Sequence, residues 1–230
     1  TPIRSLARAG RLGVQPGDRV LFKCGDVWRG EILVLTRSGA ACGHVVYGSY
    51  PAACENQPRF SGSHPITGFT QAGGGLWSAN LAAGDNAGHF PGGINQLFKG
   101  EARLPLGRWP NRNDPDFPGG YSRIVTHAGG ATIGDPRLPS GDWAGAVFHH
   151  FSIRWLLLIS LVERSGPGSL TLASGLDCYD GCGDPDPADP EDFGWGYYLA
   201  SHRLTLDQEG EWYYDSKTRE VLVVSDAAPT

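Results

Sequence analysis

Short apolar runs separated by turn residues dominate the first third of the chain. Turns containing Gly, Pro, Asp or Ser separate runs of three to six residues that carry Val, Leu, Ile, Phe or Tyr. Such spacing predicts β-strands joined by tight turns. The expected strands cover residues 19–23, 31–36 and 45–47.

A short helix is expected before these strands. Thr1 and Pro2 suit the N-cap and first-turn positions of a helix, and Ile3, Leu6 and Leu12 follow at roughly helical spacing. No further helical segment separates the strands. Short strands without helical crossovers predict either the coils of a β-solenoid or a β-sandwich.

The second half of the chain predicts antiparallel hairpins. Three pairs of apolar runs flank short turns and form a two-layer, sandwich-like core in this interpretation. The predicted pairs are 95–98 with 102–106, 152–163 with 169–173, and 211–215 with 220–224. We place a domain boundary just before the three glycines at 73–75, which gives domains 1–68 and 69–230.

Composition supports an all-β protein. Among 230 residues, 34 are Gly and 17 are Pro, while only 19% are charged. This profile excludes a coiled coil, and the lack of a three-residue glycine period excludes collagen. The longest apolar stretch, 155–162, is far shorter than the roughly 20 residues that cross a bilayer, so we expect no membrane partner. The chain has no Met and starts at Thr1, which indicates a piece of a longer product.

Acidic residues concentrate in one segment. The net charge is −5, yet residues 177–192 hold seven acids and no Lys or Arg, so the remaining surface is nearly neutral. A nearly neutral surface argues against a nucleic-acid partner. Carboxylates on a flexible loop are ligands for Ca²⁺, whereas a solvated acidic loop is the simpler interpretation. The candidate calcium ligands are the six aspartates of the segment: Asp177, Asp180, Asp184, Asp186, Asp189 and Asp192.

The five cysteines leave two interpretations open. In the first, Cys42 pairs with Cys54 and Cys178 with Cys182, which leaves Cys24 free. In the second, all are reduced, because a domain of this size needs no disulfide. Cys178 and Cys182 alone are a weak signal for a soft metal.

Two groups of titratable residues invite a catalytic interpretation. His149 and His150 are consecutive on a predicted strand, so their imidazoles point to opposite faces and do not hold one metal together. An acid and base pair could come from four carboxylates: Glu163, Asp207, Glu209 and Glu211. Asp207 and Glu211 fit a role in holding the turn at 206–212 better.

Aromatic residues suggest carbohydrate binding. Seven Trp and eight Tyr are present, and aromatic rings pack against the apolar faces of sugars. Most of these rings fill the core in the simpler interpretation. Our candidate for an exposed sugar-binding loop is Arg108, Trp109 and Asn111.

Several motifs resemble one family of proteins. Residues 2–31 and 104–111 are similar to the opening segments of secreted bacterial right-handed parallel β-helix proteins of the polysaccharide lyase and glycoside hydrolase type. Residues 194–224 resemble the end of the β-domain that these proteins insert between early coils. The resemblance implies a capping helix and the first coils of a β-helix, followed by an inserted antiparallel domain.

The resemblance also implies a function. Members of this family continue for several hundred residues after the inserted domain and carry their catalytic groups there, so we expect the catalytic coils beyond Thr230. The chain is then part of a secreted enzyme that acts on a polysaccharide and binds the downstream coils or another copy of itself. The alternative is a non-catalytic structural, self-associating or carbohydrate-binding module.

Overall fold

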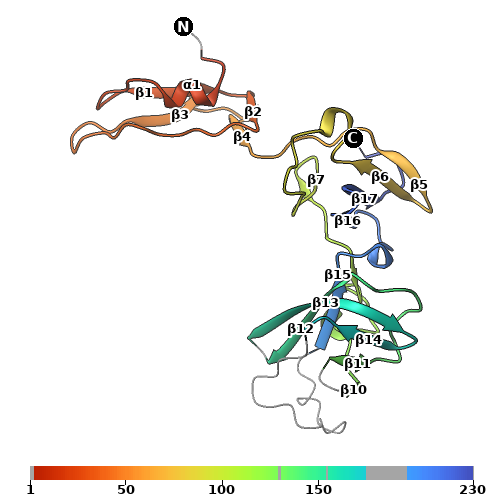
Figure 1. Ribbon diagram of the computed structural model, residues 1–230. Helices are drawn as coiled ribbons and strands as arrows, with labels where there is room; N and C mark the ends of the chain where they lie inside the picture. The colour runs from red at the N-terminus through yellow and green to blue at the C-terminus, as the bar shows by residue number, and fades with distance from the viewer. Residues whose placement is uncertain (1–2, 129–130, 154, 175–195, 230) are drawn as a thin grey trace. The chain divides into compact units, whose positions relative to one another are not determined.

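The computed structural model describes residues 3–128, 131–153, 155–174 and 196–229. These residues are nearly all β, with 7% helix and 37% strand, which confirms the predicted all-β class. The chain divides into two compact units, Thr1–Pro65 and Ile66–Thr230. Figure 1 shows the elements of both.

The first unit contains one helix and four strands. Its helix is capped by Ser5, whose Oγ accepts a hydrogen bond of 3.3 Å from the Arg8 N–H. The expected cap at Thr1 is therefore wrong, because the helix begins one turn later. The elements are α1 (Leu6–Gly10), β1 (Arg19–Lys23), β2 (Val27–Arg29), β3 (Val46–Tyr50) and β4 (Arg59–Ser61).

Both strand pairs of the first unit are parallel. Arg19 on β1 pairs with Val46 on β3, 27 residues later. Val27 on β2 pairs with Arg59 on β4, 32 residues later. Each pair forms a two-stranded sheet in the described part of this unit, so β3 and β4 each keep one edge without a neighbouring strand there.

The segment expected as a strand at 31–36 packs against α1 instead of joining a sheet. The carboxylate of Glu31 accepts a hydrogen bond of 2.7 Å from the Leu6 N–H, and the Thr36 hydroxyl donates one of 3.1 Å to the Gly10 carbonyl. Glycine is required at position 10 because a Cβ there would collide with the Val34 carbonyl oxygen. Residues 31–36 are thus held by contacts with α1 rather than by hydrogen bonds to a neighbouring strand.

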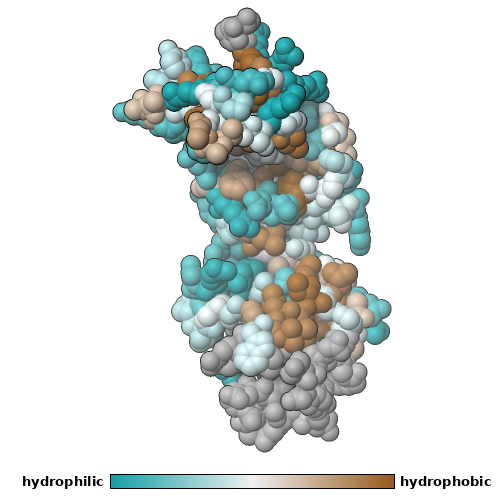
Figure 2. Space-filling model, turned by 90° about the vertical axis from the view of Figure 1, so that its left-hand side faces the viewer, coloured by the Kyte–Doolittle hydropathy of each residue, from teal (hydrophilic) through white to brown (hydrophobic). Residues whose placement is uncertain are grey.

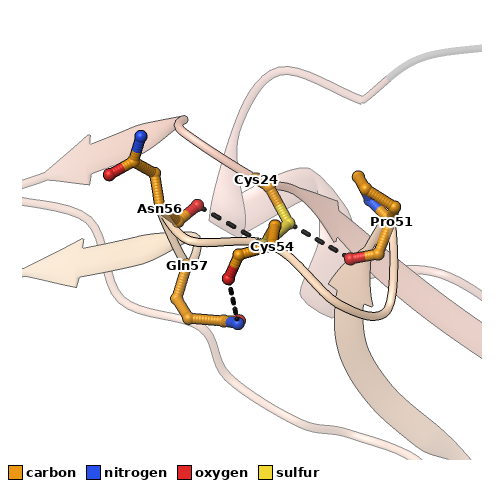
Figure 3. Close-up of a disulfide and its surroundings, with 5 residues drawn as sticks. All are labelled: Cys24, Pro51, Cys54, Asn56 and Gln57. Atoms are coloured by element: carbon orange, nitrogen blue, oxygen red, sulfur yellow. Dashed lines mark hydrogen bonds between the residues drawn. A yellow bond between two sulfur atoms is a disulfide. The ribbon is translucent and has the colours of Figure 1, made fainter.

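A disulfide joins successive turns of the first unit. Cys24 follows β1, and its bond to Cys54 closes a separation of 30 residues. Figure 3 shows the bridge with Gln57, whose amide donates a hydrogen bond of 3.0 Å to the Cys54 carbonyl. The predicted bridge between Cys42 and Cys54 is therefore wrong. The alternative in which every cysteine is reduced is wrong for Cys24 and Cys54. Cys42 is an exposed free thiol.

The core of the first unit lies between α1 and the strands. Phe22, Trp28 and Phe60 form an aromatic cluster in which the Phe22 ring contacts the other two edge-on, at centroid distances of 5.4 and 4.8 Å. A cavity of about 550 Å³ adjoins this core and is lined by residues of α1 and β1, including Ala9 and Val20. Charged residues line it as well, so it is a pocket that opens at the surface.

All paired strands in the described residues of the second unit are antiparallel. Its largest sheet has the order β10-β11-β14-β13-β12-β15-β9. These strands are β10 (Thr126–Ala128), β11 (Thr132–Gly134), β14 (Ser169–Leu172), β13 (Leu156–Gly166), β12 (Val147–Ile153), β15 (Gly196–Ala200) and β9 (Arg108–Trp109).

A second sheet of this unit has the order β16-β17-β6-β5. The remaining elements are a hairpin and three short 3-10 helices. The bounds are β5 (Thr70–Gly73), β6 (Leu76–Asn80), β7 (Phe98–Lys99), β8 (Ala102–Arg103), β16 (Trp212–Asp215), β17 (Glu220–Val224), η1 (Gly84–Asn86), η2 (Pro118–Gly120) and η3 (Arg203–Thr205).

The three predicted hairpins are present, although the strand expected at 152–163 is divided between β12 and β13, and they do not share one core. The pairs β7 with β8, β13 with β14, and β16 with β17 are all antiparallel. One cluster of buried residues surrounds Trp143 on the seven-stranded sheet, and a separate cluster surrounds Trp212 on the four-stranded sheet. The expected single two-layer core is wrong because the hairpins divide between two sheets.

Candidate functional site

The predicted sugar-binding residues lie on and after β9, the edge strand of the seven-stranded sheet. Trp109 pairs with Leu199 of β15, and its side chain is only 8% exposed. Its ring contacts Phe117 edge-on, with centroids 5.4 Å apart. The expected exposure of Trp109 is therefore wrong. The segment is a strand, so alternate side chains enter the core.

Asn111 links the segment after β9 to the turn at 206–212. Its amide donates a hydrogen bond of 2.8 Å to the carboxylate of Asp207. Nearby, the buried carboxylate of Glu211 accepts backbone hydrogen bonds of 3.0 Å from Asp207 and 3.1 Å from Gln208. Burial raises the pKa of Glu211, and these backbone donors oppose the shift. Glu211 therefore holds this turn as predicted, whereas the Asp207 carboxylate bonds to Asn111 instead.

Arg108 points to the other face of the sheet from Trp109. Its guanidinium carbon lies 4.0 Å from the centroid of the Tyr198 ring and 5.4 Å from that of Tyr121. Nε donates a hydrogen bond of 3.0 Å to the Pro110 carbonyl, and Nη2 donates another to the Gly120 carbonyl. These bonds fix the plane of the guanidinium, which forms no ion pair with a carboxylate of the described residues.

His149 completes a stack of three side chains. It is paired with Tyr198 across β12 and β15, and the two rings are stacked with centroids 4.4 Å apart and planes 4° apart. Tyr198 therefore has His149 on one side and Arg108 on the other. His150 is buried on the opposite face of β12, near Phe148, which confirms that consecutive histidines point apart.

The charge state of this stack follows from its surroundings. Burial lowers the pKa of His149, and the positive charge of Arg108 lowers it further. Burial also lowers the pKa of Arg108 and raises that of Tyr198. At neutral pH the imidazole is therefore neutral and Arg108 supplies the positive charge of the stack.

Two more rings extend the stack along the same face. Tyr121 contacts Phe151 edge-on at 5.6 Å and lies 6.0 Å from Tyr198. This approach needs Gly196, which lies opposite Phe151 in the ladder. Gly196 has φ +109°, and a Cβ there would lie 2.8 Å from the Ser122 carbonyl oxygen and from Cβ of Tyr121. We call Arg108, Tyr121, His149, Phe151 and Tyr198 the aromatic-arginine cluster; each member is half-buried.

An aliphatic row adjoins the cluster. Leu157, Ile159 and Leu161 alternate along β13 and remain 38%, 60% and 53% exposed. Ile159 pairs with His149 and Leu157 with Phe151, so the row continues the same face. Figure 2 shows an apolar patch on the surface at the height of this sheet. The cluster is thus flanked by an apolar surface.

The candidate calcium ligands at 177–192 lie outside the described residues, as do Cys178 and Cys182. In the parts of the chain that the structure describes, no group of three or more His, Cys, Asp or Glu side chains is arranged to hold a metal ion. None of the described helices is long and apolar enough to cross a membrane.

Sequence patterns alone did not identify the cluster. His149 was recognisable as a strand residue, but Tyr121, Phe151 and Tyr198 carried no separate signal. The alternation of Tyr197 and Tyr198 on a strand predicts that one ring is buried and the other faces outward. Only the register of β9, β12 and β15 identifies Arg108 and His149 as the neighbours of Tyr198.

Comparisons with known proteins bear on the fold. No model of a protein family matches the chain, and no curated protein matches it. A solved structure described as a glycoside hydrolase is similar, with a TM-score of 0.60 and 17% sequence identity. The match covers 93% of this chain and 37% of that one, so the chain spans little more than a third of the glycoside hydrolase. At this identity the similarity establishes a shared fold.

Proposed function

We propose that this chain is part of a secreted carbohydrate-active protein of the right-handed parallel β-helix type, either a polysaccharide lyase or a glycoside hydrolase. The observation that carries the proposal is the parallel pairing of β1 with β3 and of β2 with β4, at spacings of 27 and 32 residues. Strands that pair in parallel with the next turn of the chain are typical of the coils of a β-helix. The similarity to a glycoside hydrolase supports the carbohydrate-active part of the proposal.

In this proposal the first unit supplies a capping helix and the first coils, and the second unit is an inserted domain. The free edges of β3 and β4 favour further coils, or another copy of the chain, as partners. Exposed apolar side chains on these strands and their neighbours support the same partners: Leu21, Val27, Val46, Tyr50 and Phe60.

The chemistry of the whole protein is proposed to lie on coils outside this chain. The glycoside hydrolase that shares the fold is much longer than the matched part, which leaves room for such coils. The Cys24–Cys54 bridge is compatible with an extracellular location, because disulfides persist in oxidising compartments. The contribution of this chain is then binding and positioning of a polysaccharide.

The test separates binding from cleavage. The purified chain is run through native gels that contain neutral or uronic-acid polysaccharides, and the same mixtures are assayed for reducing ends and unsaturated products. We expect retardation by at least one polysaccharide without cleavage. Absence of retardation by every polysaccharide would overturn the binding role. Product release would overturn the assignment of the chemistry to other coils.

The alternative, a carbohydrate-binding module without any catalytic partner, is favoured by one observation. The aromatic-arginine cluster lies on a sheet face of the second unit, which has its own hydrophobic core. Expression of the chain together with the downstream coding sequence, if one exists, distinguishes the two. Cleavage by the longer product supports the enzyme, and binding without cleavage supports the module.

A further inference from the structure

We propose that the aromatic-arginine cluster is a binding site for the carboxylate of an acidic sugar residue, with Arg108 as the anion-binding group and Tyr121 and Phe151 as the apolar surface for the sugar ring. The inference rests on the carbohydrate-binding role proposed above. It adds a site and a ligand class to it.

Arg108 carries the positive charge of the cluster and is partly desolvated. The guanidinium is half-buried, and no carboxylate of the described residues forms an ion pair with it. The carboxylate of Glu211 stabilises this charge from a distance, but it is hydrogen-bonded to the N–H groups of Asp207 and Gln208. A partly desolvated cation without an anion is costly, and a carboxylate ligand would offset this cost.

Only some of the N–H groups of the Arg108 guanidinium are hydrogen-bonded within the described residues. Its Nε and one Nη2 hydrogen are directed at the carbonyls of Pro110 and Gly120. A guanidinium has five N–H groups, so three have no acceptor among the described residues. The two backbone contacts and the stacking on Tyr198 hold the guanidinium in one orientation. Such preorganisation favours bidentate recognition of a planar carboxylate.

The aromatic rings of the cluster differ in what they can contact. Both faces of Tyr198 are occupied, by His149 and by Arg108, so this ring positions Arg108 rather than receiving a sugar. Tyr121 and Phe151 meet edge-on beside it and are half-buried. Aromatic surface of this kind packs against the C–H groups of a pyranose. An acidic sugar presents both a carboxylate and such a surface.

Ligand binding at this site should depend on pH through His149. His149 is faced by Arg108 from β9, Tyr198 from β15 and the apolar Ile159 from β13. An anion bound at Arg108 would offset the positive charge that opposes protonation of His149. By thermodynamic reciprocity, binding then strengthens as pH falls through the lowered pKa of His149.

The experiment compares two ligands that differ at the carboxyl group, which is a free carboxylate in one and a neutral methyl ester in the other. Oligogalacturonate and its fully methyl-esterified form are titrated into the full chain by calorimetry at pH 7. We expect at least tenfold tighter binding of the free acid. Arg108→Gln is expected to abolish this difference, whereas the control Arg164→Gln, at an exposed arginine on β13, is expected to retain it.

A second measurement starts from the wild-type chain. The imidazole of His149 is titrated by NMR in the wild-type chain, with and without oligogalacturonate. We expect its pKa to rise in the presence of the ligand, and binding to lose its pH dependence in His149→Asn. An unchanged His149 titration at saturating ligand would overturn the site.

The outcomes distinguish this inference from the broader proposal. Equal binding of the acid and the ester, or binding of neutral polysaccharides only, overturns the carboxylate site and leaves carbohydrate binding intact. Lack of binding to every acidic and neutral polysaccharide overturns both.

Discussion

The phenol of Tyr197 donates a hydrogen bond of 2.8 Å to Oδ2 of Asp135, inside the core of the seven-stranded sheet. The Ser122 hydroxyl donates to the same oxygen, and the Arg137 N–H donates to Oδ1 at 2.8 Å. Burial raises the pKa of Tyr197 far above its usual value, and the charge of Asp135 raises it further. The buried carboxylate thus depends on three donors, from Tyr197, Ser122 and Arg137.

Removal of the Tyr197 hydroxyl should destabilise the second unit. Tyr197→Phe leaves the ring in place and takes one donor from a buried carboxylate, so we expect a loss of about 1–3 kcal/mol in the free energy of unfolding. Urea denaturation followed by fluorescence measures it. Tyr213→Phe is the control, because the Tyr213 phenol has no hydrogen bond to the described residues. Equal losses in both variants would show that the network contributes nothing specific.

The Cys24–Cys54 bridge should stabilise the first unit. A closed loop of 30 residues contributes about 3–4 kcal/mol through the lost entropy of the unfolded chain. We therefore expect Cys54→Ser to accelerate hydrogen exchange at the amides of β1 and β3. The exposed thiol of Cys42 provides the control, since Cys42→Ser should leave exchange unchanged. Peptide mapping that found Cys42 bonded to Cys54 would contradict the structure directly.

The stability of the chain should fall on acidification. The pKa of His149 lies below its usual value of about 6.5 because of burial and then the charge of Arg108. The unfolded chain therefore takes up a proton near pH 6.5, whereas the folded chain takes it up only at lower pH. Acid consequently favours the unfolded chain between pH 7 and pH 5.

Thermal melts across this pH range test the contribution of His149. The wild-type chain should lose more stability between pH 7 and pH 5 than His149→Asn does. His202 contributes in the same direction, because burial lowers its pKa too, so the variant should retain part of the dependence. His44→Asn, at an exposed imidazole, is the control. Identical profiles for His149→Asn and the wild type would refute the assignment.

Calcium binding by the acidic segment remains a prediction from the sequence. Seven acids without a basic residue repel one another, and a divalent cation would offset that repulsion. Binding to the folded chain alone raises stability by about 2.7 kcal/mol at a hundredfold excess over Kd. Melting with Ca²⁺ and with chelator should show this shift, and Asp184→Ala with Asp186→Ala should remove it while Asp116→Ala should not. Equal midpoints in the wild type would leave the segment as solvated surface.

The sequence by itself determined the class of the fold and most of its hairpins. Alternating apolar residues flanked by Gly, Pro and Asp describe local preferences of the backbone, and these preferences survive in β13 with β14 and in β16 with β17. The opposite orientations of His149 and His150 follow from the two-residue period of a strand alone. The turn-holding role of Glu211 was also predictable, because its backbone partners are only three and four residues away.

Tertiary structure decided everything that depends on long-range pairing. It determined which cysteine bridges to Cys54, because parallel pairing of β1 with β3 brings the end of β1 to the turn that follows β3. It buried Trp109, since the pairing of β9 with β15 makes a strand of a segment that otherwise has the composition of a loop. It also assembled Arg108, Tyr198 and His149 from three strands. Sequence spacing contains no information on that register, because the choice of neighbouring strands is made by packing over the whole sheet.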